Sequence, residues 1–351
     1  MKEHLLNYRQ DIQVLRGVSV LLVVIFHTRQ ALMPNGYAGV DIFFLISGFV
    51  LWPQINNLFF NRGKALSLSN WPEKKIGYLQ FLKRRYDRLI PTFIISLIIT
   101  LLILLVLSSY SIHKDMSLQA ISSMFFIGNL GAETLVGNYF SPQPNPYMHL
   151  WSLSAEWQVY FFAPISIVLL KKIFPIKFTL ALLLISVSNF LIQILFELSI
   201  NIYYSSFSRI WEFYFGVLTA IYLRQFSLAI NSLQLVFIRI IGILCLIIII
   251  SPFEMRVIFS QFLSAIFFVS FLISNPLIYT RINNILLWLG DRSYSIYLYH
   301  FPLIYLSLYS PLSPSTFSFR VLGTAISLII TLIIANWSYT KIEIPSIRNR
   351  K

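Results

Sequence analysis

The feature that most constrains this chain is the recurrence of apolar runs long enough to cross a membrane as helices. A bilayer core about 30 Å thick takes roughly 20 apolar residues in a helix. About ten runs of that length follow one another along the sequence: 12–32, 37–58, 88–109, 150–170, 178–198, 207–224, 234–252, 255–275, 287–309 and 319–340. We therefore expect an all-α fold, a polytopic integral membrane bundle of about ten transmembrane helices.

The composition agrees with a membrane protein and excludes other classes of chain. Of the 351 residues, 57% are hydrophobic and 11% are charged, whereas a soluble domain carries about 25% charged residues. This rules out an ordinary soluble domain, a disordered chain and a small disulfide-stapled module. The single cysteine, Cys245, lies in an apolar run and is expected to be a packing residue.

The basic residues gather between the apolar runs and predict the orientation of the chain. Its formal net charge is +14. Lys and Arg concentrate in the cytoplasmic loops of membrane proteins, and here they recur in every second connection, at residues 60–88, 171–177, 281–292 and 341–351. We therefore expect both termini in the cytoplasm. We attribute the excess charge to orientation in the membrane and expect no nucleic-acid partner.

A single membrane domain is expected over residues 1–351, with its core at about 8–345. No cleavage pattern follows the first apolar run, which is therefore expected to be a retained helix rather than a signal peptide. We expect no internal repeat and no appended soluble domain. The apolar stretch 117–130 leaves the helix count open by two, since it can also be interpreted as a re-entrant segment.

Two ionisable residues of the first run, Arg16 and His27, are spaced to share one helix face. Eleven residues at 100° each come to three turns and about 20°. A cation that holds an anionic group and an imidazole that moves a proton suit a cofactor with a phosphate head and a reactive far end. The alternative is that Arg16 reaches the lipid headgroups while His27 bonds a neighbouring helix.

Further polar motifs follow His27 in a fixed order. They occupy residues 36–49, 81–91, 149–158, 208–212 and 289–302. In this order, and on this pattern of apolar runs, the series resembles the acyltransferase family 3 membrane proteins. The resemblance covers the chain from about Tyr8 to Pro345.

The resemblance implies a multi-pass enzyme of the bacterial plasma membrane. Members of this family O-acylate surface polysaccharides, lipopolysaccharide and other acceptors. The chain would take an acyl group, expected to be acetyl, from acyl-coenzyme A and deliver it to a hydroxyl of a cell-surface or lipid-linked saccharide. The family's Arg-x10-His pair maps onto Arg16 and His27, and its Arg-x-x-Arg motif maps onto Arg85 and Arg88.

Arg84, Arg85 and Arg88 are spaced to form one cationic patch if this segment is helical. Guanidinium groups bind phosphate oxygens in a bidentate manner, and coenzyme A carries a pyrophosphate and a ribose phosphate. With Arg16, the three arginines are therefore expected to bind the acyl donor. The competing interpretation is a plain orientation signal.

Glu156 is the clearest carboxylate within an apolar run, and we expect it to be catalytic together with His27. It shares a helix face with Ser152 and with His149, provided that the helix already begins there. The alternative is an ion pair with Arg209. The family pattern has a second acid directly after this position, where this chain has Trp157.

Saccharide contacts are expected from Asp41, Trp151, Ser152, Tyr297 and His300. Aromatic and hydroxyl-bearing side chains stack on sugar rings and bond their hydroxyl groups, although aromatic residues near a membrane surface also serve as interfacial anchors. Asp41 could instead bond His27 or cap a helix.

The mechanism expected for His27 is general-base catalysis on the acceptor hydroxyl, with transient acyl transfer to the imidazole as the alternative. No metal-ligand spacing is present, and no metal is expected. The rival functions are a transporter or flippase of a lipid-linked saccharide, and a membrane scaffold. The number of ionisable residues within the apolar runs argues against a scaffold.

Overall fold

The computed structural model describes residues 9–60, 71–107, 113–132, 145–196, 201–225, 230–274, 281–309, 313 and 316–348. Within these ranges the regular structure is helical and contains no strand, which confirms the all-α prediction. The helices are α2 (Gln10–Thr28), α3 (Ala38–Phe59), α4 (Trp71–Leu107), α5 (His113–Met124), α6 (Gly128–Gly131), α7 (Leu150–Ile173), α8 (Phe178–Phe196), α9 (Asn201–Tyr204), α10 (Ile210–Gln225), α11 (Ser232–Ile250), α12 (Val257–Ser274), α13 (Arg281–Asp291), α14 (Ser293–Leu308), α15 (Phe317–Ser338) and α16 (Ile344–Arg348), with 3-10 turns η1 (Gln30–Leu32) and η5 (Phe207–Arg209) and the π-helix η6 (Tyr339–Glu343).

Eight helices of the described chain are long and apolar enough to cross a membrane. They lie in eight of the ten predicted runs and make the chain a polytopic membrane protein. Helix α10, in the predicted run 207–224, has 16 residues and is not one of these eight helices. The continuous helix predicted over 287–309 is wrong, because the chain breaks at Arg292 between α13 and α14. The break coincides with the polar sequence Gly290-Asp291-Arg292, and Gly290 packs directly on the backbone of Gln13.

The stretch 117–130 does not form a continuous helix. It contains the end of α5, a turn and the start of α6. The turn places Phe126 at φ 57°, in the left-handed region that side chains other than glycine rarely adopt. The Phe126 ring stacks on Trp157 of α7 at 4.7 Å between ring centroids. This break suits a segment that turns back against α7 rather than one that crosses.

The chain divides into two compact units, which are described separately. Unit 1 comprises residues 1–50 and 212–294. Unit 2 comprises residues 51–211 and 295–351.

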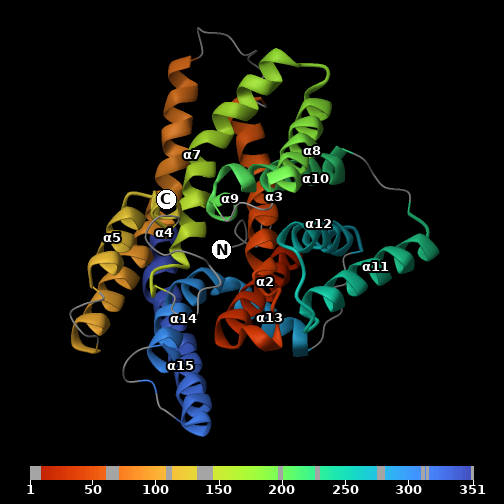
Figure 1. The fold of residues 1–351 in the computed structure, drawn as a ribbon. Coiled ribbons are helices and arrows are strands. Elements are labelled where there is room, and N and C mark those ends of the chain that lie inside the picture. Colours follow the sequence, from red (N-terminus) through yellow and green to blue (C-terminus); the bar gives the residue numbers. More distant parts are fainter. Residues whose placement is uncertain are drawn as a thin grey trace. The chain divides into compact units, whose positions relative to one another are not determined.

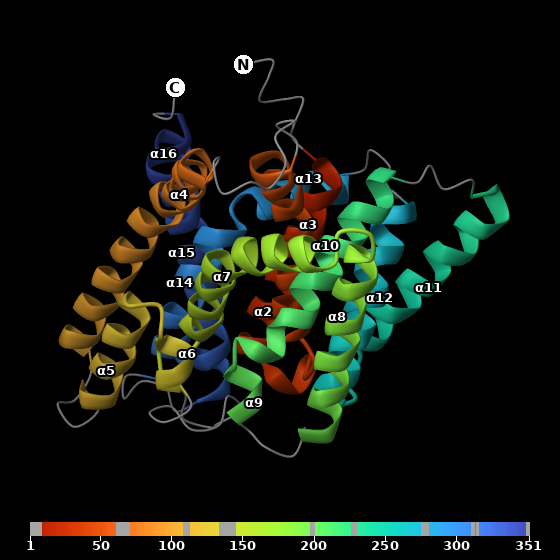
Figure 2. The ribbon, with the colours of Figure 1, turned by 90° about the horizontal axis from the view of Figure 1, so that it is seen from above.

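Unit 1 is held together by helix crossings at glycines. Helices α2 and α13 lie side by side (Figures 1 and 2). A Cβ atom at Gly17 would overlap the Leu286 carbonyl. Helices α3 and α10 meet in the same way, since a Cβ atom at Gly48 would overlap the Phe213 carbonyl. Small residues at such crossings let backbones approach closely in membranes. Helices α11 and α12 form a neighbouring hairpin (Figure 1).

Replacing Gly48 with alanine is expected to destabilise unit 1 by about 1–3 kcal/mol, because the new methyl group meets a backbone carbonyl that cannot swing away. Gly323→Ala is the matched control, since a Cβ atom there lies in ordinary contact, 3.5 Å from Ser307 Cβ. Thermal unfolding in detergent should show a lower midpoint only for Gly48→Ala. Equal midpoints for both variants would contradict the close crossing.

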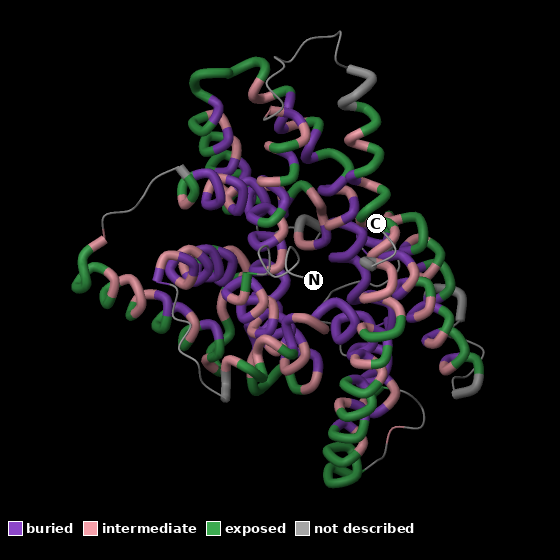
Figure 3. Tube along the Cα trace, turned by 180° about the vertical axis from the view of Figure 1, so that it is seen from behind, coloured by how far each residue is buried: buried purple, intermediate pink, exposed green. Residues whose placement is uncertain are grey.

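Unit 2 contains the longest helix, α4, with 37 residues and Pro91 inside it. Helices α5 and α6 pack on α7, and η6, which continues α15, packs on α4. Helix α16 lies beside α4 (Figure 2). Much of α15 is exposed (Figure 3). Apart from Arg320, its exposed large side chains are apolar, as suits contact with lipid: Phe317, Phe319, Val321, Leu322, Ile326, Ile329, Ile330, Leu332, Ile333 and Trp337.

Candidate active site

Arg16 and His27 both lie on α2 of unit 1, which confirms the helix that their spacing requires. The Arg16 Nε atom donates a hydrogen bond to Ser293 Oγ at 3.0 Å, so the cation reaches the first residue of α14. His27 lies in the last turn of α2 and is 7% exposed. Its ring packs edge-on against Phe26 at 5.2 Å between centroids. The helix ends at Thr28, so His27 lies at its far end from Arg16.

Asp41 lies in the first turn of α3 and is fully buried. The start of α3 packs directly on α2, because a Cβ atom at Gly36 would overlap the Leu22 carbonyl and one at Gly39 would overlap the Ser19 carbonyl. Direct bonding between Asp41 and His27 stays a prediction.

The turn between α2 and α3 is anchored by Asn35. Its Nδ2 atom donates to the Phe253 carbonyl at 2.8 Å, and its Oδ1 atom accepts from the Met255 N–H at 2.9 Å. The Tyr37 hydroxyl donates to the Met255 carbonyl at 3.3 Å. The connection from His27 to α3 is therefore fixed to the turn between α11 and α12. Spacing along the sequence did not reveal this contact across 218 residues.

The three arginines expected to bind phosphate lie on α4 of unit 2. Arg84 is exposed, whereas Arg85 and Arg88 are half-buried. Arg88 makes no hydrogen bond or ion pair with any described residue, although its Nε atom is buried. Asp87, between Arg85 and Arg88 in the sequence, forms an ion pair with Lys83, with 2.9 Å between Oδ2 and Nζ. Arg88 is therefore the member of the patch whose guanidinium is available to a ligand.

Arg85 connects the patch to α7. Its guanidinium carbon lies 4.6 Å from the Phe81 ring centroid and 5.0 Å from that of Tyr160. Its Nη2 atom donates to Gln54 Oε1 at 3.2 Å. A cation over an aromatic face is attracted by the ring quadrupole. Gln54 and Tyr160 were not among the predicted site residues.

Glu156 accepts a hydrogen bond from the Tyr160 hydroxyl, one turn further along α7. Tyr160 thus contacts the cationic patch through its ring and Glu156 through its hydroxyl. The four-residue spacing of the two side chains was the available sequence signal. Arg85, Tyr160 and Glu156 form a continuous polar connection between α4 and α7 within unit 2.

Tyr297 joins α14 to the start of α7. Its hydroxyl donates to the His149 carbonyl at 2.7 Å and shares a 2.6 Å hydrogen bond with Ser152 Oγ. Glu156 lies within electrostatic range of this phenol. The Tyr297 side chain is 8% exposed, so it is a buried member of the network rather than an interfacial anchor.

His300 is fully buried, and its ring lies 5.5 Å from that of His149. The His300 Nδ1 atom faces the carbonyl oxygens of Tyr297 at 2.7 Å and Ile296 at 3.2 Å. Two acceptors require the proton on Nδ1, so a neutral His300 keeps Nε2 as its acceptor nitrogen. His149 Nε2 lies 3.2 Å from the Leu298 carbonyl. His149, which was not among the predicted site residues, therefore belongs to the same cluster, because it contacts both His300 and Tyr297.

Trp151 is fully buried in an aromatic cluster. The Arg209 guanidinium carbon lies 5.2 Å from its ring centroid, and the rings of Tyr203 and Tyr204 lie at 5.1 and 5.5 Å. The indole is thus surrounded by protein groups. A saccharide contact for Trp151 stays a prediction.

The predicted site residues fall into two sets. Unit 1 holds Arg16, His27 and Asp41, and unit 2 holds the other eight. The structure brings Arg85 to Glu156 through Tyr160, and it brings Tyr297 and Ser152 to the histidines. Among the described residues, no group of three or more His, Cys, Asp or Glu side chains could hold a metal ion.

Comparison with known proteins gives matches over nearly the whole chain. A family model described as an acyltransferase domain matches residues 9–336. O-acetyltransferase OatA of Staphylococcus aureus (strain NCTC 8325 / PS 47) is 25% identical over 360 residues, which cover 97% of this chain. The protein SAS0844 of S. aureus (strain MSSA476) is 28% identical over 362 residues, which also cover 97% of the chain. The chain matches 57% of the length of each relative. No solved structure matches it.

Proposed function

The chain belongs to the acyltransferase domain family, and we propose that it is an integral membrane O-acyltransferase of the bacterial plasma membrane. The acyl group, which we take to be acetyl, comes from acyl-coenzyme A. The acceptor is a hydroxyl of a cell-surface or lipid-linked saccharide. Family membership and the O-acetyltransferase relative support this assignment.

The observation that carries the proposal is the polar connection from Arg85 through Tyr160 to Glu156. Ionisable side chains are costly inside a membrane and mark functional sites there. Arg88, next to this connection on α4, has a guanidinium without a described partner. A phosphate-bearing donor would satisfy it with charge-assisted hydrogen bonds. A flippase has no need of a phosphate clamp that leads to a carboxylate within a membrane span.

In the proposed reaction, the acceptor hydroxyl oxygen attacks the thioester carbonyl carbon. A new C–O bond forms, the C–S bond breaks, and coenzyme A leaves as its thiol. His27 takes the proton from the hydroxyl and returns it to the leaving sulfur. Glu156 orients the acceptor through the hydroxyl-bearing network of Ser152 and Tyr297. The patch on α4 is assigned to the donor phosphates. Arg16 is assigned to them from the family's Arg-x10-His pair alone.

The test of the function is expression in a host that lacks envelope O-acylation. Mass spectrometry of the envelope saccharides should show an ester-sized mass increment that alkali removes and that an empty vector does not produce. Movement of a lipid-linked saccharide across the membrane without any ester and without consumption of acyl-coenzyme A would favour the flippase.

Replacing Arg88 with alanine is expected to raise the KM for acyl-coenzyme A about ten- to a hundredfold, with kcat nearly unchanged, because one charge-assisted phosphate contact is lost. Lys75→Ala, an exposed cation on the same helix, is the control. Initial rates should be compared with acyl-pantetheine, which carries no phosphate. An equal rise in KM for both donors would contradict phosphate binding by Arg88.

A further inference from the structure

Glu343 is a buried carboxylate that the proposed reaction does not use. Its side chain is 1% exposed, and it ends the π-helix η6. It lies within the candidate membrane span Phe317–Ser346. A carboxylate in such a place is costly and marks a functional position by default.

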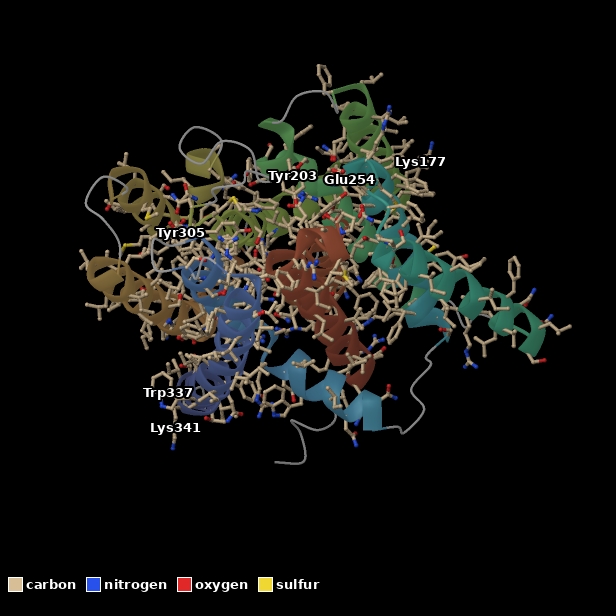
Figure 4. All side chains as sticks on the ribbon, turned by 60° about the horizontal axis from the view of Figure 1, so that its bottom comes forward. Lys177, Tyr203, Glu254, Tyr305, Trp337 and Lys341 are labelled. Atoms are coloured by element: carbon tan, nitrogen blue, oxygen red, sulfur yellow. The ribbon has the colours of Figure 1, made fainter. Side chains whose placement is uncertain are left out.

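The π-helix separates an exposed side from a buried one. Figure 4 shows Trp337 and Lys341 together at the end of α15 where it continues into η6, and both side chains are exposed. Glu343 instead points into unit 2. π-helical turns are rare and occur frequently at functional sites, where the extra residue changes the direction of a side chain. In η6, the buried residue is Glu343.

The partner of Glu343 is α14. The Ser295 hydroxyl, fully buried, donates a hydrogen bond to Glu343 Oε1. Tyr299, one turn further along α14, lies within electrostatic range of the same carboxylate. One face of α14 is therefore attached to η6.

The opposite face of α14 carries the contacts to α7. At 100° per residue, Ser295 and Tyr297 point about 200° apart around the helix axis. Tyr297 bonds Ser152 and the His149 carbonyl, and His300 packs against the His149 ring. A rotation of α14 that releases Ser295 from η6 would therefore also displace the hydroxyl and imidazole groups on its other side.

We propose that Glu343 is a positioning residue for acyl transfer, which holds Ser295 and so sets the rotation of α14 that places Tyr297 and His300 against α7. The catalytic part of this inference rests on the proposed function. The anchoring of α14 does not, and it can be measured by itself.

The experiment compares Glu343→Ala, Glu343→Gln and Ser295→Ala with the wild type in detergent. Glu254→Ala removes an exposed acid and serves as the control. Hydrogen exchange of the α14 backbone is measured by mass spectrometry, and kcat and the KM for acyl-coenzyme A are measured with a saccharide acceptor. Ser295→Ala keeps the proposal testable if Glu343→Ala does not fold.

Ser295→Ala and Glu343→Ala are expected to speed exchange in α14 and to lower kcat, each by about tenfold, while the donor KM stays within about twofold. Glu343→Gln should retain most of both properties, because its amide oxygen still accepts from Ser295. Unchanged exchange in α14, or faster exchange throughout the chain, would overturn the proposal, as would a higher KM at unchanged kcat. A wild type that transfers nothing would overturn the proposed function. Hydrogen exchange in α14 would then test only whether Glu343 anchors this helix through Ser295.

Discussion

His27→Ala is expected to reduce acyl transfer about 10²- to 10⁴-fold, the contribution typical of a positioned general base. The imidazole is buried at the end of α2, and the turn that follows it is fixed by Asn35. A replacement that leaves this packing intact should therefore remove the base without unfolding unit 1. The measurement is the rate of ester formation at matched protein concentration and matched thermal midpoint.

Gln30→Ala is the control for His27→Ala, because Gln30 is exposed three residues further along the chain. Transfer by His27→Ala at the wild-type rate would refute the catalytic assignment. The same preparation distinguishes the two mechanisms for His27. A transient acyl carrier predicts labelled protein when acceptor is withheld from labelled acyl-coenzyme A, and a general base predicts none.

Glu156→Gln is expected to lower kcat about a hundredfold, because the acceptor hydroxyl loses part of its orientation. The amide keeps the size of the side chain but removes the charge that bonds Tyr160 and acts on Tyr297. Tyr160→Phe should have a smaller effect, about threefold to tenfold, because it removes one hydrogen bond and leaves the carboxylate in place. Both variants are measured as kcat at saturating donor.

The control for Glu156→Gln is Glu254→Gln, which neutralises an exposed acid. If Glu156→Gln transfers at the wild-type rate, the carboxylate has only a structural role. If Tyr160→Phe is as slow as Glu156→Gln, the phenol itself takes part in the reaction, and the assignment of Glu156 as the group that orients the acceptor is contradicted.

The architecture was largely predictable because hydrophobic length and the spacing of charges are local properties. Arg16 and His27 lie on one helix, and the arginine patch lies on another, as their spacing required. The break at Arg292 was missed, because the polar sequence there is short and apolar residues on both sides keep the average hydropathy of the run high. Tertiary packing at Gly290 accompanies the break and is not visible in a hydropathy pattern.

The site was less predictable because its contacts join distant segments. Tyr297 meets Ser152 across 145 residues, and Arg85 meets Tyr160 across two helices. No spacing rule along one helix contains such pairs. Glu343 was missed for the same reason, since its partner Ser295 lies 48 residues earlier in the chain. Sequence reasoning thus found the chemically notable residues, and the structure added those that connect them.

In the proposed reaction, one acyl group moves from acyl-coenzyme A to one acceptor hydroxyl. The most direct measurement uses purified protein in liposomes, with labelled acetyl-coenzyme A and a saccharide acceptor, and counts released coenzyme A thiol against labelled ester. We expect equal amounts of thiol and alkali-labile ester, and His27→Ala should form both about 10²- to 10⁴-fold more slowly. Thiol release without ester, or saccharide movement with no thiol release at all, would contradict it.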